Sequence, residues 1–223
     1  MKKRFLIIRH AEAEKTLKGI HGGSGTPLTT QGREDVLNIA SYLRNQFSDI
    51  SANTLICCSF VPQVLETANV ISQLLDIPML KFVELRNMDM GVLAGLSDDE
   101  AKQKFPDIMK RLELWRNGKL DEKRLNIPEK EPIDSFLQRI RGVLRECYAS
   151  DKTNIIIIVT RSIGIGILNL LLKNSELKGQ SYRRFRFDPC SLTVIESDVI
   201  GYGKLISHNE TFFLGRHIEY PDD

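Results

Sequence analysis

A chain of 223 residues, 42% of them hydrophobic, is long enough to bury a large core as one domain. Its formal net charge of +2, with acids and bases interspersed, excludes the broad basic face typical of nucleic-acid-binding proteins. No apolar run approaches the ~20 residues of a membrane-spanning helix, and the N-terminal run is too short for a signal-peptide core. We therefore expect one cytoplasmic domain over residues 1–223, with neither nucleic acid nor a membrane as partner.

The first half of the chain alternates apolar runs with helical patterns. Phe5–Ile8 and Leu55–Cys58 are short, continuous apolar runs, which are typical of parallel strands covered on both faces. Gln31–Asn45 and Val64–Leu75 repeat apolar residues at helical spacing and therefore predict amphipathic helices. This order of elements predicts βαβ units with right-handed crossovers.

The second half continues the alternation after a polar segment. Residues 98–131 are polar and contain prolines, and we expect them to form a helical excursion that caps a pocket. Ile133–Tyr148 predicts a helix, and Ile155–Val159 is a β-branched run that predicts a third central strand. Gly164–Leu172 then predicts a buried helix.

Two alternating stretches near the C-terminus, Ser191–Glu196 and Lys204–Ile206, are joined through two glycines and predict an antiparallel hairpin. Together with the preceding alternation, they indicate an α/β fold. We expect a three-layer α/β/α sandwich with a mostly parallel central sheet and a C-terminal antiparallel hairpin.

The four cysteines, Cys57, Cys58, Cys147 and Cys190, lack the spacing of a metal site. Cys57 and Cys58 are neighbours in a predicted strand, so their side chains should point to opposite faces of the sheet. We expect all four to be buried free thiols, and we expect no metal and no cofactor.

Polar residues at the ends of the predicted strands are the first candidates for a functional site. Ligands of open α/β sheets bind outside the carboxyl ends of the strands. Arg9 and His10 follow the first strand directly, and Arg161 follows the third. By themselves, an arginine and a histidine at a strand end are weak evidence of a site, so the surrounding motifs decide.

The sequence around these residues resembles the histidine phosphatase superfamily, whose members are phosphoglycerate mutase-like. The matching blocks extend through nearly the whole chain: Leu6–Glu12, Thr26–Gly32, Ser59 with Glu66–Ala68, Leu85–Gly91 with Gly95–Leu96, Val159–Gly164 and His208–Thr211. The resemblance implies that His10 is the nucleophile that becomes phosphorylated and that Arg9 is one clamp on the phosphate. It also implies a second arginine, a second histidine and a carboxylic acid, which hold the phosphoryl group and protonate the leaving oxygen.

Three of these five pocket positions depart from the family pattern. Gln63 stands at the second arginine and can donate only a neutral hydrogen bond. Asn87 stands at the carboxylic acid and cannot deliver a proton, whereas Arg161 stands at the second histidine and adds a permanent positive charge. Loss of a general acid lowers rates by about 10²–10⁴, and loss of one charge-stabilising donor by about 10²–10³. We therefore expect Arg9, His10, Gln63, Asn87 and Arg161 to bind an anion better than they cleave an ester.

Other residues near these blocks leave alternatives open. Asp89 or Glu12 could replace the missing acid, although a solvated loop position for Asp89 and a structural role for Glu12 are the favoured interpretations. His21, in a glycine-rich loop, either contacts the substrate or is an ordinary exposed residue. Glu131 coincides with the glutamate of the family's late Gly-Glu-Ser element, but its flanking residues differ.

Two hypotheses for the function follow. The leading one is a weakly active or inactive protein of this fold that binds a phosphate ester or another small anion. The alternative is an active phosphatase that works through phospho-His10 on phosphomonoesters, or on acyl phosphates and phosphoramidates, whose leaving groups need little protonation. A third possibility is a different reaction with His10 as general base. The basic cluster at residues 183–186 is either a solvated face or a contact for a partner, and a protein partner or a homodimer stays open.

Overall fold

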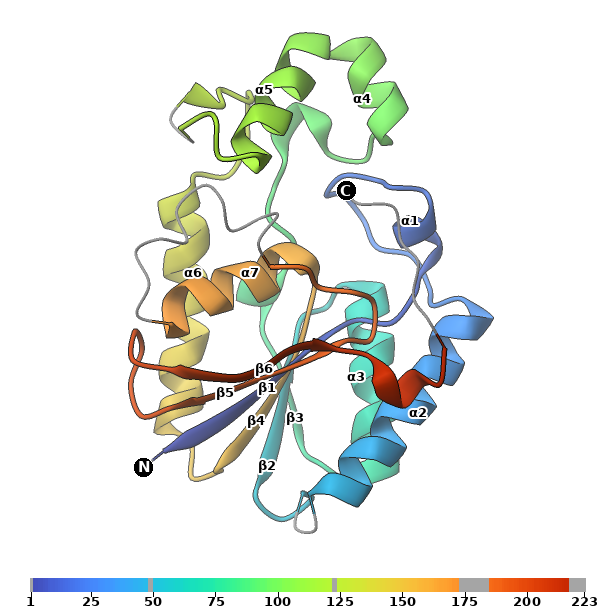
Figure 1. The fold of residues 1–223 in the computed structure, drawn as a ribbon, viewed down its shortest axis with the longest axis vertical. Helices are drawn as coiled ribbons and strands as arrows, with labels where there is room; N and C mark the ends of the chain where they lie inside the picture. The colour runs from blue at the N-terminus through green and yellow to red at the C-terminus, as the bar shows by residue number, and fades with distance from the viewer. Residues whose placement is uncertain (1, 48–49, 122–123, 173–184, 217–223) are drawn as a thin grey trace.

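The structure, a computed structural model, describes residues 2–47, 50–121, 124–172 and 185–216. In this part of the chain six strands form one sheet, in the order β3-β2-β4-β1-β5-β6 (Figure 1). Helices cover both faces of the sheet, so the predicted α/β/α architecture is confirmed. Residues 183–184 of the predicted basic cluster lie outside the described residues.

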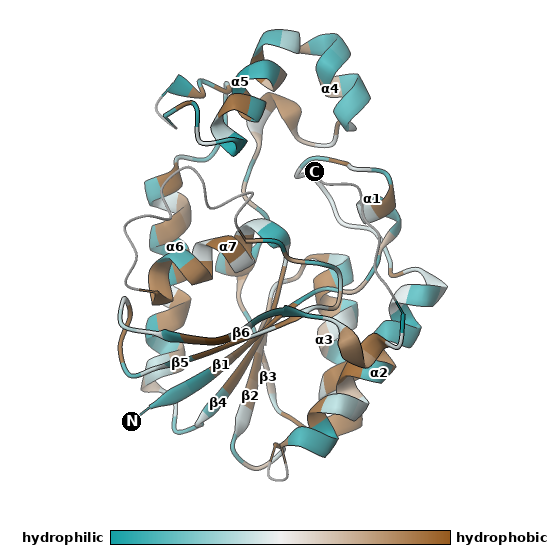
Figure 2. Cartoon of the chain, in the orientation of Figure 1, coloured by the Kyte–Doolittle hydropathy of each residue, from teal (hydrophilic) through white to brown (hydrophobic). Residues whose placement is uncertain are grey.

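The centre of the sheet is parallel. β1 (Lys3–Arg9) pairs with β4 (Asn154–Val159), β4 pairs with β2 (Thr54–Cys58), and β2 pairs with the short edge strand β3 (Met79–Lys81). Apolar residues fill β1, β2 and β4 because helices cover both faces of these strands. Figure 2 shows brown along the inner parts of these strands, between the helical layers, and teal at the N-terminal end of β1. The three predicted central strands are therefore confirmed.

The C-terminal pair of strands extends this sheet. β5 (Leu192–Ser197) runs antiparallel to β1, and β6 (Lys204–Glu210) runs antiparallel to β5 at the edge. The predicted antiparallel hairpin is thus confirmed. Its second strand continues four residues beyond the predicted end at Ile206, because Glu210 still pairs with Leu192 of β5.

The helices divide between the two faces of the sheet. α2 (Thr30–Gln46) and α3 (Pro62–Leu75) pack on one face, and α6 (Ile133–Ala149) and α7 (Arg161–Leu171) pack on the other. α7 begins three residues before its predicted start, because Thr160 has extended backbone dihedrals at the helix N-cap and the chain turns helical directly after β4.

The cysteines lie where the strand geometry predicted. Cys58 belongs to the core between the sheet and the α2/α3 layer, whereas Cys57 belongs to the core on the α6/α7 side. All four cysteines are buried and free. The Sγ atoms of Cys57 and Cys147 lie 3.8 Å apart, in van der Waals contact.

The polar excursion contains α4 (Asp98–Lys104) and α5 (Pro106–Arg116), which lie at the top of the view in Figure 1. The N-terminus of α4 has a capping box, since the Ser97 hydroxyl accepts from the Glu100 N–H while the Glu100 carboxylate accepts from the Ser97 N–H. The excursion has an apolar cluster of its own: Leu93, Ala101, Met109, Leu112, Leu125 and Ile127.

Short helices complete the described elements. They are α1 (Glu14–Leu17) and the 3₁₀ helices η1 (Val83–Leu85), η2 (Gly91–Leu93) and η5 (Phe212–Leu214). Across the described ranges, every helix is too short or too polar to cross a membrane.

Candidate functional site

A cavity of about 1610 Å³ opens at the carboxyl ends of the central strands, and all five residues of the predicted site line it. Arg9 ends β1 and His10 follows it, Arg161 begins α7 directly after β4, and Gln63 lies in the first turn of α3 after β2. Parallel neighbours bring their carboxyl ends to the same edge of a sheet, which explains why segments distant in sequence meet here. Asn87 reaches the cavity from the loop between η1 and η2. The individual roles of these residues stay predictions.

One ring nitrogen of His10, Nδ1, forms a hydrogen bond with the backbone. Its Nδ1 lies 2.8 Å from the Ala11 carbonyl oxygen, which can only accept, so Nδ1 carries the proton and Nε2 keeps its lone pair. Only 4% of the residue is exposed. Burial above all, and then the charges of Arg9 and Lys15, lower the pKa of His10 to about 3. At neutral pH the imidazole is therefore neutral, as a nucleophile requires.

The backbone around His10 is fixed by both neighbouring strands. The His10 N–H donates to the Val159 carbonyl of β4 at 2.9 Å, and the Cys190 N–H donates to the carbonyls of Arg9 at 3.1 Å and His10 at 3.2 Å. The Arg9 guanidinium also donates to the Phe187 carbonyl. The end of β1 is thus tied to the chain on both sides, which preorganises the candidate nucleophile.

Gln63 presents a defined end of its amide to the cavity. Its Oε1 accepts the Thr26 N–H at 3.2 Å, so the NH₂ end is the one left to donate. The residue is 3% exposed. Gly25 is needed beside it, because a Cβ at this position would lie 2.2 Å from Oε1. The geometry suits one neutral hydrogen bond to an anion in the cavity.

Arg139 fixes the loop that carries Asn87. Its guanidinium donates to the carbonyls of Glu84, Arg86 and Asn87, the last at 3.1 Å. It also donates to both carboxylate oxygens of Glu131, at 2.7 and 2.9 Å. Burial by itself would raise the pKa of Glu131, but the hydrogen bonds and charge of Arg139 hold this pKa below its usual value. Glu131 therefore lines the cavity as a carboxylate and is no proton donor near neutral pH.

Glu12 and Asp89, the two alternatives to the missing acid, form hydrogen bonds outside the cavity. The Glu12 carboxylate accepts from the Thr29 hydroxyl at 2.7 Å, and the Asp89 carboxylate accepts from the Gly91 N–H at 2.9 Å. Neither residue lines the cavity. The charged side chains that lower the pKa of His10 are Arg9 and Lys15. The structural and solvated interpretations of these two residues are favoured.

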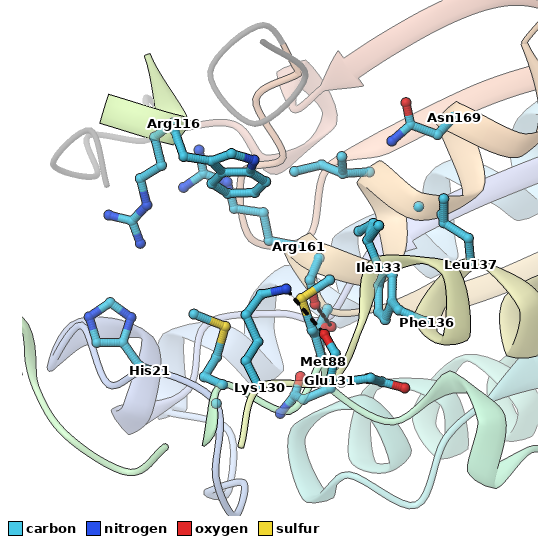
Figure 3. Close-up of a pocket in the computed structure, with 18 of the residues that line it drawn as sticks. His21, Met88, Arg116, Lys130, Glu131, Ile133, Phe136, Leu137, Arg161 and Asn169 are labelled. Atoms are coloured by element: carbon cyan, nitrogen blue, oxygen red, sulfur yellow. Dashed lines mark hydrogen bonds between the residues drawn. The ribbon is translucent and has the colours of Figure 1, made fainter. Parts of the chain in front are cut away.

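Polar and basic side chains from separate segments surround the outer cavity. Figure 3 shows His21, Arg116, Lys130 and Arg161 arranged around it. His21 is not an ordinary exposed loop residue, since its side chain is 9% exposed and its Nε2 lies 2.6 Å from Asp98 Oδ1 at the start of α4. This contact joins the glycine-rich loop to the helical excursion. A contact between His21 and a ligand stays a prediction.

Lys15 is a basic cavity residue that sequence reasoning missed. It lies in α1, is 7% exposed and lines the same cavity as His10. Its Nζ donates to the Ser24 carbonyl at 3.1 Å, and burial lowers its pKa. No pattern in the sequence marks it, because its burial depends on how the glycine-rich loop folds over α1.

No group of three or more His, Cys, Asp or Glu side chains in the described ranges is arranged to hold a metal ion.

The low pKa of His10 makes the stability of the protein depend on pH. The unfolded chain binds a proton at this residue as pH falls through about 6.5, whereas the folded protein does so only near 3. Protonation therefore favours unfolding, and this residue should remove about 2 kcal/mol of the unfolding free energy between pH 7 and pH 5. Urea denaturation of the wild type and of His10→Gln at both pH values measures this contribution. Between pH 7 and pH 5, the unfolding free energy of His10→Gln should fall less than that of the wild type. Equal decreases in the two proteins would contradict the low pKa of His10.

Known proteins match the chain over nearly its whole length. The model of the histidine phosphatase superfamily (branch 1) matches residues 5–210. Two relatives called "Probable phosphoglycerate mutase GpmB" are each 25% identical, the Proteus mirabilis protein over 192 residues and the Escherichia coli (strain K12 / DH10B) protein over 195 residues. Each alignment covers 85% of this chain and 83% of the relative.

Solved structures share the fold. Bacillus stearothermophilus YhfR matches with a TM-score of 0.77 at 19% identity, covering 95% of this chain and 99% of its own. The α-ribazole phosphatase from Shigella flexneri matches with a TM-score of 0.72 at 24% identity. The match covers 93% of this chain and 96% of the phosphatase. A mycobacterial glucosyl-3-phosphoglycerate phosphatase matches with a TM-score of 0.74 at 18% identity. The match covers 94% of this chain and 99% of that phosphatase. With the family model spanning the sheet and the cavity residues together, the chain belongs to the histidine phosphatase superfamily, branch 1.

Proposed function

We propose that the protein binds a small phosphate ester or related anion in this cavity and hydrolyses ordinary phosphomonoesters only weakly or not at all. The observation that carries the proposal is the set of groups that line the cavity with His10. Arg9, Lys15 and Arg161 are basic, whereas Gln63 and Asn87 are neutral amides that cannot act as a general acid. Such a site stabilises a bound anion but lacks the proton that an alkoxide leaving group needs.

The composition of the cavity wall supports an anionic ligand. Basic side chains outnumber acidic ones among the described lining residues: Arg9, Lys15, Arg116, Lys119, Lys130, Arg141 and Arg161 against Asp98, Asp121, Glu131 and Asp134. Two of the acids are engaged, Asp98 with His21 and Glu131 with Arg139. The names of several relatives also refer to phosphorylated compounds, which favours a phosphorylated ligand here.

A second candidate is a phosphatase for substrates whose leaving groups need little protonation. The observation that favours it is His10 itself, which is neutral and has Nε2 available. In this reaction Nε2 attacks phosphorus and the bond from phosphorus to the leaving atom breaks, which is oxygen in an acyl phosphate and nitrogen in a phosphoramidate. Water later hydrolyses phospho-His10. Acyl phosphates and phosphoramidates have such leaving groups. A mutase reaction is not proposed, because it cycles a phosphoryl group through steps that use the missing acid.

The test compares binding with turnover. Calorimetric titration with inorganic phosphate should give saturable binding to the wild type. Glycerol 2-phosphate, an alkyl ester, should be hydrolysed no faster by the wild type than by His10→Ala. Robust His10-dependent hydrolysis of this ester would contradict the proposal.

Acetyl phosphate tests the second candidate. The active-phosphatase hypothesis expects hydrolysis that depends on His10 and a phosphohistidine that survives an alkaline quench. If neither the hydrolysis nor the phosphohistidine is found, the second candidate is wrong and phosphate binding alone remains.

A further inference from the structure

Lys15 is a buried cation whose environment in the described residues is incomplete. The residue is 7% exposed, and its Nζ donates to a neutral carbonyl, that of Ser24. No carboxylate within the described ranges forms an ion pair with it. Burying an ammonium group without a counter-charge is unfavourable by several kcal/mol, so buried lysines are normally paired.

The position of Lys15 is fixed by the chain around it. The Lys15 N–H donates to the Thr26 hydroxyl at 3.0 Å, and Ala13 forms an antiparallel bridge with Leu28. These contacts hold α1 against the glycine-rich loop and direct Lys15 inward. The side chain lines the same cavity as His10, and its charge acts on the imidazole together with that of Arg9.

We propose that Lys15 is an anion-binding residue of this protein, which supplies next to His10 the positive charge that Gln63 cannot supply. The inference rests on the proposed function and names the group that holds the phosphate. An ammonium has three N–H donors, and Ser24 accepts one of them, so two remain for oxyanion oxygens. Gln63 then adds a neutral hydrogen bond, and Arg9 lies beside the nucleophile.

The chemistry suits a phosphate dianion in particular. Lysine acts on phosphate as a compact point charge, whereas arginine acts as a planar fork. A bound dianion would give the buried ammonium the counter-charge that the described residues lack. Phosphate should therefore stabilise the folded protein, since a ligand that binds only the native state raises its stability.

The test uses inorganic phosphate as the probe and three variants of the full chain. Lys15→Met keeps an unbranched apolar stem without the charge, and Lys15→Arg restores a cation. Lys18→Met is the matched control, because Lys18 is exposed and contacts Glu14 at 3.9 Å one turn away. We expect Lys15→Met to weaken phosphate binding about 10- to 100-fold, the effect of losing one hydrogen bond between charged groups. Lys15→Arg should recover most of the affinity, and Lys18→Met should bind as the wild type does.

Thermal unfolding without phosphate separates this role from a structural one. Lys15→Met removes an uncompensated buried charge, so its melting temperature should equal or exceed that of the wild type, while its stabilisation by phosphate should be lost. A lower melting temperature with undiminished phosphate affinity would overturn the inference and assign Lys15 a structural role. In that case the proposed function stands. If the wild type itself fails to bind phosphate, the proposed function is wrong and the inference about Lys15 falls with it.

Discussion

Asn87→Glu is expected to raise His10-dependent hydrolysis of glycerol 2-phosphate by about 10²-fold or more, because a general acid contributes about 10²–10⁴ to such reactions. Asn87 lines the cavity together with His10, and Arg139 holds its backbone. A carboxylic acid at this position can protonate the leaving oxygen while Nε2 attacks phosphorus. Release of inorganic phosphate between pH 5 and pH 7 measures the gain, which should be largest at the acidic end, where more of the new acid is protonated.

Asn87→Gln is the matched control, since it has the length of glutamate but no proton to deliver. Its rate should remain at the level of the wild type. The double variant Asn87→Glu with His10→Ala should lose the gain entirely. Equal rates for the glutamate and glutamine variants would show that the absent acid is not what limits hydrolysis.

Gly32→Ala should destabilise the protein by about 3 kcal/mol, the upper end of the range for overpacking. A Cβ at this position would lie 2.1 Å from the Glu12 carbonyl oxygen, a backbone atom that cannot move alone. Alanine is favoured over glycine in a helix by about 1 kcal/mol, so the clash outweighs the gain in propensity. For a protein of this size the melting temperature should fall by roughly 6–12 °C. The change also pushes the first turn of α2 away from the segment that follows His10.

Gly142→Ala provides the contrast within the same fold. Gly142 lies inside α6, and a Cβ there would meet nothing within 4 Å. This substitution should raise the unfolding free energy by about 0.5–1 kcal/mol through helix propensity. Calorimetry of both variants measures the difference, and a Gly32→Ala protein as stable as Gly142→Ala would contradict the close contact.

The parts of the fold that the sequence predicted are those with a strong burial pattern. β1, β2 and β4 each contain a continuous apolar run because both faces of the sheet are covered there, so each strand can be recognised in the sequence. β3 has no such run. It is a three-residue edge strand, and two of its residues, Leu80 and Lys81, are exposed. Its existence depends on pairing with β2, which local sequence does not encode.

The candidate site divides in a similar way. The family motifs predicted that five residues form one site: Arg9, His10, Gln63, Asn87 and Arg161. All five line one cavity at the carboxyl ends of the strands. Lys15 and Arg139 were not predicted. Lys15 stands between motif positions, and its burial depends on how the glycine-rich loop folds over α1. Arg139 acts on backbone carbonyls, which leave no trace in the identity of the residues that carry them.

The guanidinium of Arg139 binds the backbone carbonyls of Glu84, Arg86 and Asn87. These bonds do not depend on which side chain stands at position 87. An acid or an amide can therefore occupy this position on the same backbone, so the chemistry of the loop can change while its course is kept.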